Sequence, residues 1–296
     1  MNILRPSCFP EYRLEQWNSL RIQLLWAYQK KGDLPQVIDS MDYHFQSAAL
    51  VIKGWAKVGV STDAEHRADP GQWLIFKQGR RRQQFSVDCE LLSIAYRFQL
   101  PTGEALYDDG LPCIFDATEA PRLEREARKI LPLMARHVDA GFLRLQQVLD
   151  MRDYMLTQNA LRSFLLELTA VLQVKGIHPQ VMGKGNARVA QAMEMINSAD
   201  IYELGKSVTN ASIAKRVSLS LPHLERLMVA ETGHTLYQHI DLRKLQTAQD
   251  ALLANHDSMK AIAYSLGFSS PAHFNSWFKK RTRMTPLQFR RQGAFG

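Results

Sequence analysis

Two helix-turn-helix patterns near the C-terminus carry side chains that could contact nucleic acid. Ile213-Ala214 matches Ile262-Ala263 at a separation of 49 positions, and Thr235 matches Thr285 at a separation of 50. The extra residue falls in the second turn, so the helices stay in register. The expected helix, turn and helix cover 211–217, 218–220 and 221–228 in the first copy, and 260–266, 267–270 and 271–278 in the second. In such a motif the second helix enters the major groove of DNA.

The exposed face of each second helix supplies the candidates for contact with bases. Arg can pair with guanine, Asn can pair with adenine, and Glu can accept a hydrogen bond from cytosine. Leucine, methionine and aromatic residues between these positions are expected to form the core. The candidate base-contacting residues are Leu221, Pro222, Glu225 and Arg226 in the first motif, and Pro271, Ala272, Asn275 and Ser276 in the second.

Phosphate contacts are expected where the second helices begin and in the basic cluster behind the second motif. Ser270 before Pro271 is typical of a helix N-cap followed by proline at the first helical position, and Gly267 suits a turn that needs positive φ. The candidate phosphate-contacting residues are Ser220, Ser270, Lys279, Lys280, Arg281 and Arg283.

The charge distribution supports a polyanionic partner for the C-terminal third. Residues 186–296 hold 14 Lys and Arg against 8 Asp and Glu, whereas the other 185 residues hold 23 against 21. The three cysteines, at positions 8, 89 and 113, lack the spacing of a disulfide framework or a zinc site. Without a signal peptide or a membrane-length apolar run, the chain is expected to be cytoplasmic.

The elements before these motifs favour a β-rich region followed by helices. Short apolar runs separated by turn residues predict an antiparallel barrel or sandwich, whereas Arg21–Tyr28 fits either a strand or a helix. The predicted strands are 47–52, 55–60, 73–76, 82–86 and 91–98. Helical periodicity follows at 120–134, with a kink expected at Pro132, and at 150–174.

The second of these helices carries a leucine stripe that allows two interpretations. Leu161, Leu165, Leu168 and Leu172 could form a homodimer seam or pack on the β-rich region inside one chain. We expect the homodimer, because a seam just before a linker would bring two DNA-binding domains to neighbouring sites. The glycines and proline of residues 176–185 predict that linker.

The C-terminal part of the sequence resembles the AraC/XylS family of bacterial transcription regulators. The resemblance rests on residues 267–280, on Met284-Thr-Pro286 and on Glu231-Thr-Gly-His-Thr235 of the first motif, and it covers residues 189–292. It implies two helices in successive major grooves on one face of DNA, and contact with RNA polymerase. The sequence departs from the family at Met228-Val-Ala230, where a basic or aromatic run is usual, and at Pro222. Phosphate anchoring is therefore expected to depend more on the second motif.

The N-terminal region resembles the cupin-like sensor domain of the same family, through Asp69-Pro-Gly-Gln-Trp-Leu-Ile-Phe76. His44 and His66 stand alone, so we expect no metal, no cofactor and no enzymatic activity. The arginines at 80–82 could pair with an anionic effector or form a solvated turn. The candidate effector-binding residues are Trp55, Trp73, Phe76, Arg82, Phe85 and Tyr96.

Together these patterns predict an α+β chain, with an N-terminal antiparallel β-barrel, a helical extension and an all-α C-terminal domain. The expected divisions are a sensor at 1–118, a helical, dimerising segment at 119–175, a linker at 176–185 and a DNA-binding domain at 186–296. The expected function is sequence-specific regulation of transcription at promoter DNA, controlled by a small-molecule effector. A metal-dependent cupin enzyme with a DNA-binding appendage and a regulator without a small-molecule effector remain as alternatives.

Overall fold

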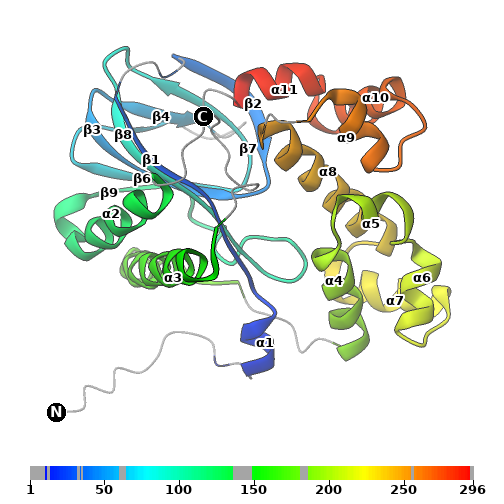
Figure 1. The fold of residues 1–296 in the computed structure, drawn as a ribbon. Helices are drawn as coiled ribbons and strands as arrows, with labels where there is room; N and C mark the ends of the chain where they lie inside the picture. Colours follow the sequence, from blue (N-terminus) through cyan, green and yellow to red (C-terminus); the bar gives the residue numbers. More distant parts are fainter. Residues whose placement is uncertain are drawn as a thin grey trace. The chain divides into compact units, whose positions relative to one another are not determined.

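A computed structural model describes residues 11, 14–31, 34, 36–59, 65–135, 149–180, 186–254 and 257–293. The chain forms two compact units (Figure 1). The N-terminal unit holds Met1–Gln99 and Ala105–Val181, and the C-terminal unit holds Leu100–Glu104 and Met182–Ala294. Val60 of one predicted strand and residues 181–185 of the predicted linker lie outside the described residues.

Two antiparallel sheets build the N-terminal unit, as the turn-separated apolar runs predict. The first sheet has the order β1-β8-β3-β6-β9 and the second has the order β2-β7-β4-β5. The strands are β1 (Arg21–Lys31), β2 (Val37–Tyr43), β3 (Gln46–Lys53), β4 (Ala56–Gly59), β5 (His66–Ala68), β6 (Gln72–Phe76), β7 (Gly79–Phe85), β8 (Glu90–Gln99) and β9 (Cys113–Asp116). The ambiguous segment at 21–28 is thus a strand, since it pairs along its length with β8.

Helices of the N-terminal unit cover one face of the five-stranded sheet. A short α1 (Leu14–Asn18) precedes β1, and η1 (Ala117–Glu119) leads into α2 (Pro121–Ala135) and then α3 (Met151–Val174). Helices α2 and α3 lie side by side (Figure 1). The ring of Phe164 on α3 contacts Trp73 and Tyr96 from the sheet, with ring centroids 6.4 and 6.0 Å apart.

This packing corrects the predicted dimer seam. Leu161, Leu165, Leu168 and Leu172 are all at most 3% exposed within the single chain. They are buried because the stripe of α3 faces α2 and the sheet, so it is not available to a second copy. The second of the two interpretations of the stripe therefore holds, and polar replacement of these leucines would disrupt the N-terminal unit itself.

The C-terminal unit is helical throughout its described elements. They are α4 (Ala187–Ser198), α5 (Ile201–Lys206), α6 (Asn210–Arg216), α7 (Leu221–Thr232), α8 (Leu236–Ala254), α9 (Met259–Ser265), α10 (Pro271–Thr282) and α11 (Pro286–Gly293). Helices α6 and α7 form the first helix-turn-helix motif, and α9 and α10 form the second, both at the predicted positions. Helix α8 joins the two motifs (Figure 1). The predicted fold class, antiparallel sheets followed by an all-helical unit, is confirmed.

Candidate nucleic-acid interface and sensor cavity

Each motif turns sharply before its second helix, which we call the recognition helix. In both motifs the second residue after the first helix adopts a left-handed conformation, with φ of 57° at Ser218 and 80° at Gly267. The Gly267 turn lies against α5, so that a Cβ at this position would overlap backbone atoms of Gly205. The prediction of positive φ at Gly267 is confirmed, and close packing adds a second reason for glycine there.

Both recognition helices begin at a serine followed by an early proline. The Ser270 hydroxyl accepts a hydrogen bond from the backbone N–H of His273 at 3.1 Å, so it caps α10 as expected. Ser220 precedes α7 without a side-chain capping bond and is exposed. A backbone amide or a hydroxyl at such a helix start can donate to a phosphate oxygen.

Most of the predicted base-contacting side chains lie on the surface. In α7, Leu221, Pro222 and Arg226 are exposed. In α10, Ala272, Asn275 and Ser276 are exposed, whereas Pro271 is half-buried. These exposed residues give each recognition helix a surface that is open to a ligand. Besides Pro271, one further residue of the predicted set is not exposed.

That residue is Glu225, whose carboxylate is used inside the C-terminal unit. One oxygen accepts from the backbone N–H of Leu236 at 3.0 Å, and the other accepts from the Asn210 amide at 3.4 Å. The carboxylate thus occupies the first turn of α8, where it complements the unpaired N–H groups and the helix dipole. The assignment of Glu225 to cytosine contact is wrong in this structure.

Two exposed histidines were missed by the sequence analysis. His223 and His273 each occupy the third position of a recognition helix and are exposed. Residues three apart lie on the same helical face, so His223 shares the face of Arg226 and His273 that of Ser276. This spacing was visible in the sequence and could have added both histidines to the candidates.

The basic cluster behind α10 divides into exposed and engaged residues. Lys279, Lys280 and Arg283 are exposed, as phosphate contacts require. Arg281 instead forms a bidentate ion pair with Asp241 of α8, with N···O distances of 2.6 and 2.8 Å. The indole N–H of Trp277 donates to the same carboxylate, and the Arg281 guanidinium lies 4.7 Å from the Trp277 ring centroid.

These contacts correct the prediction for Arg281. Its side chain is directed toward α8 because it lies one turn after Trp277, on the inner side of α10. A guanidinium that already pairs with a carboxylate in two places has little to offer a phosphate. The exposed positive charge at the end of α10 thus comes from Lys279, Lys280 and Arg283.

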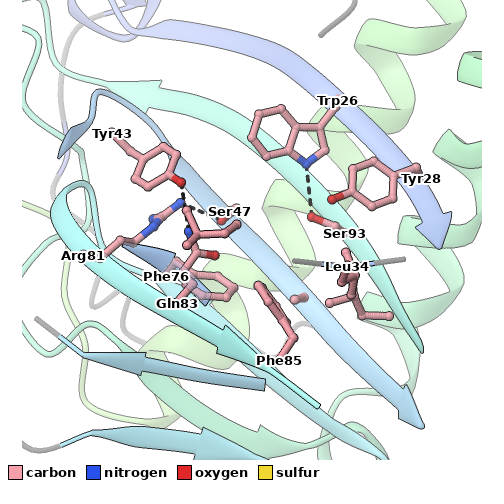
Figure 2. A pocket seen from close by; sticks show the side chains of 13 residues that line it. Trp26, Tyr28, Leu34, Tyr43, Ser47, Phe76, Arg81, Gln83, Phe85 and Ser93 are labelled. Carbon is pink, nitrogen blue, oxygen red and sulfur yellow. Dashed lines mark hydrogen bonds between the residues drawn. The ribbon is translucent and has the colours of Figure 1, made fainter. Parts of the chain in front are cut away.

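A small cavity lies between the two sheets of the N-terminal unit (Figure 2). It measures about 30 Å³, which is room for one or two water molecules. Arg81, Tyr43, Ser47 and Gln83 gather at one end, and Trp26, Tyr28 and Ser93 lie toward the other (Figure 2). Burial raises the pKa of Tyr43 to about 12, so its phenol stays neutral.

Only two of the six predicted effector residues line this cavity, namely Phe76 and Phe85. Trp73 and Tyr96 contact Phe164 on the opposite face of their sheet. Trp55 lies elsewhere, with the charged ends of Lys57 and Arg67 over its ring. The last residue, Arg82, is exposed.

Strand alternation explains the error at Arg82. Along β7, residues at alternate positions point into the interior, and these positions are Arg81, Gln83 and Phe85. The predicted arginine thus lies on the correct strand, but the arginine that lines the cavity is Arg81, one residue earlier. Trp26 and Tyr28 were missed because their segment was not assigned to a strand.

Neither a metal centre nor a membrane span is found in the described part of the chain. No group of three or more His, Cys, Asp or Glu side chains among these residues is placed to hold a metal ion. His44, one of the two histidines considered above, is buried in the N-terminal unit. None of the helices that the structure describes is both long and apolar enough to cross a bilayer.

Comparison with solved structures supports this fold over most of the chain. Wild-type ToxT from Vibrio cholerae, solved with an unsaturated fatty acid bound, aligns with a TM-score of 0.50 and 13% sequence identity. The alignment covers 92% of this chain and 95% of ToxT. At this identity the likeness extends to the fold alone.

Sequence comparisons concern the two motifs. A family model described as a helix-turn-helix domain matches residues 213–292. RhaS of Escherichia fergusonii, an HTH-type transcriptional activator, is 32% identical over 85 residues, which cover 29% of this chain and 31% of RhaS. PqrA of Proteus vulgaris, named a probable transcription factor, is 37% identical over 83 residues, which cover 28% of this chain and 68% of PqrA. With two recognition helices matched across two thirds of such a relative, the chain belongs to the AraC/XylS family of DNA-binding transcription regulators.

Proposed function

We propose that this regulator binds promoter DNA with the exposed faces of α7 and α10, under the control of a small molecule in the cavity of the N-terminal unit. The observation that carries the proposal is the pair of recognition helices held by α8 in one compact unit, each with an open polar face. The resemblance implies that the bound regulator acts through RNA polymerase in the cytoplasm, and we include both in the proposal.

Within α7, we propose that Arg226 contacts a base. Its side chain is exposed one turn into the helix, on the face that it shares with His223. A bidentate arginine–guanine contact contributes about 1–3 kcal/mol of discrimination. In α10, Asn275 occupies the position 50 residues after Glu225, and its exposed amide can contact adenine.

Binding of the full chain to promoter fragments, measured by fluorescence anisotropy, tests these assignments. The Arg226→Ala variant is expected to lose about 1–3 kcal/mol on the preferred fragment and little on random DNA. Arg152→Ala, at an exposed arginine on α3 of the other unit, serves as the matched control and should bind as the parent does. An equal loss on both kinds of DNA would reassign Arg226 to phosphate.

The expected domain division gives a second test of the proposal. A fragment of residues 186–296 contains both motifs and the whole of α8, so it should fold and bind the same promoter fragment without the sensor. Helical circular dichroism and anisotropy would check both properties. A fragment that stays unfolded, or that folds and ignores every promoter fragment, would contradict the boundary.

Control by a small molecule is supported by a cavity with polar and apolar walls inside the N-terminal unit. The ToxT structure contains a fatty acid, and we extend only the idea of a small effector to this chain. Promoter affinity should change when the effector is added. Unchanged affinity with every ligand that binds the N-terminal unit would favour a regulator without a small-molecule effector.

A further inference from the structure

The cavity of the N-terminal unit contains a buried arginine whose hydrogen bonds are incomplete. Arg81 is 2% exposed. One terminal nitrogen donates to the Lys77 carbonyl at 2.6 Å, and the other donates to the Ser47 hydroxyl at 3.1 Å. Nε, one of the N–H donors that remain, has no hydrogen-bond partner. Arg81, which lines the cavity, therefore keeps an unused N–H donor.

In the part of the chain that the structure describes, no Asp or Glu is recorded as a partner for the positive charge of Arg81. Within the described ranges, its recorded neighbours are neutral hydrogen-bond acceptors and aromatic rings. The guanidinium lies 4.3 Å from the ring centroid of Tyr43 and 4.8 Å from that of Phe76. Burial lowers the pKa of Arg81 to about 10. Arg281 provides the contrast in the same chain, because that less buried guanidinium has Asp241 as a bidentate partner.

The chemistry of the walls limits what could supply the missing negative charge. Among the described residues that line the cavity, Arg81 is the only one with a charged side chain, so the cavity matches one negative charge. A carboxylate fits the planar guanidinium fork and is small, whereas a phosphate is bulkier and usually needs more donors. Phe76 and Phe85 provide an apolar wall, which suits a short hydrocarbon part attached to the carboxylate.

We propose that the cavity binds a small monocarboxylate, with the carboxylate paired to Arg81 and the hydrocarbon part against Phe76 and Phe85. This inference rests on the proposed function, since it names the chemical class of the effector. The volume of about 30 Å³ accommodates the head of such a molecule, and a longer chain displaces the surrounding side chains. Short acids are therefore expected to bind first.

The first experiment uses the full chain without substitution. Thermal stability is measured with sodium acetate, propionate, butyrate and hexanoate, and with the corresponding neutral amides, at constant ionic strength. The acids are expected to raise the melting temperature and the amides are not, because only the acids carry the charge that Arg81 lacks. Equal shifts with acid and amide, or no shift with any acid at millimolar concentration, would overturn the proposal.

The second experiment compares two neighbouring arginines of the same strand. Arg81→Met removes the cavity charge while keeping an apolar side chain of similar length, and Arg82→Met makes the same change on the exposed face. In calorimetric titrations with the best acid, Arg81→Met should lose about tenfold or more in affinity, and Arg82→Met should bind as the parent does. Unchanged affinity in a folded Arg81→Met variant would refute the role of Arg81. Should that variant not fold, the comparison of acids with amides still decides.

Promoter binding separates this inference from the proposed function. If the acid binds through Arg81 but leaves promoter affinity unchanged, the carboxylate site stands and effector control through this cavity fails. If the acid changes promoter affinity equally in the parent and in Arg81→Met, effector control stands and the carboxylate site fails.

Discussion

The two helix-turn-helix motifs follow the same backbone path with different side chains at corresponding positions. Each motif has two residues in the left-handed conformation, one in the turn and one at the end of the recognition helix. The first motif has Ser218 in the turn and Gly233 at the helix end, whereas the second has Gly267 and Arg283. Glycine is therefore found at the helix end in the first motif and in the turn in the second.

The surroundings explain why the two glycines are not equivalent. A Cβ at Gly267 would meet the backbone of Gly205, but a Cβ at Gly233 would meet nothing within 4 Å. Glycine at 267 is thus needed both for the positive φ and for the lack of space around it, while glycine at 233 is favoured by the positive φ only. Serine and arginine are therefore accepted at positions where only a positive φ is needed. Glycine is required where the backbone is also closely packed, as at Gly267.

The cores beneath the recognition helices also differ. The core of the first motif is largely aliphatic, with Leu224 and Met228 buried among residues of α4, α6 and α8. The second is aromatic, and the rings of Phe274, Phe278 and Phe289 contact one another in sequence. His239 occupies in the first motif the place that Phe289 holds in the second, 50 residues later.

Replacing Gly267 by the serine of the first turn should have the largest effect. The Gly267→Ser variant combines a left-handed serine with a clash against Gly205, and we expect a loss of about 3 kcal/mol or more in the free energy of unfolding. Urea unfolding followed by circular dichroism measures it. Gly233→Ser is the control in open space, with an expected loss of about 1–2 kcal/mol. Equal losses would show that packing against α5 does not matter.

Removing the Arg281 side chain should have the next largest effect on stability. Arg281→Ala leaves Asp241 without its bidentate partner, and we expect a loss of about 2 kcal/mol, less than for a fully buried pair. The salt dependence of DNA binding should stay unchanged, because this guanidinium is not free for phosphate. A shallower salt dependence together with unchanged stability would return Arg281 to the DNA-contacting residues.

Lysine substitutions test whether the second motif provides most of the phosphate contacts. Lys279→Ala should reduce the slope of log affinity against log salt by about one unit on any DNA sequence. Val229 occupies the equivalent exposed position in α7, so Val229→Lys should increase the slope by about the same amount if both helices approach DNA alike. A slope that does not respond to Val229→Lys would mean that the end of α7 faces away from the backbone.

Acid should destabilise the core of the first motif more than that of the second, because the first contains His239 where the second has Phe289. At neutral pH this is the smallest of the expected effects on stability. Burial, with a contribution from His234, lowers the pKa of His239 to about 4 from its usual 6.5. The unfolded chain takes up this proton first, so the stabilisation is complete above pH 6.5 and is lost as the pH falls toward 4. His239→Phe should remove this part of the pH dependence, as measured by urea unfolding at several pH values. An unaltered pH profile in the variant would assign the acid sensitivity to other groups.

Local sequence patterns were sufficient for the helix-turn-helix motifs. The repeat fixed the two pairs of helices, and Gly267 and Ser270 adopted the turn and cap that their residue types favour. These features depend on neighbours within a few positions along the chain. For the same reason, the recognition-helix surface could be predicted for Arg226, Asn275 and Ser276.

Assignments that depended on distant partners failed. Glu225 and Arg281 look like solvent-facing polar residues in their own helices, but each meets a group on α8 that sequence spacing does not reveal. The α3 leucines form a correct stripe whose partner could not be inferred. In β7, three consecutive arginines leave only strand alternation to decide which one enters the cavity, and that depends on where the strand begins.

Helix α8 contributes to both motifs, and this gives its length a particular importance. Leu236 and Ile240 belong to the core of the first motif. Asp241 accepts a hydrogen bond from Trp277 of the second motif, and the Leu252 carbonyl accepts one from Arg290 of α11, which follows that motif. Its 19 residues span about 28 Å, comparable with the roughly 34 Å of one turn of DNA. One inserted residue would rotate one end of α8 by about 100° relative to the other. In the proposed complex, this helix sets the phase between two segments of the bound DNA, and its surface should tolerate substitution far better than its length tolerates change.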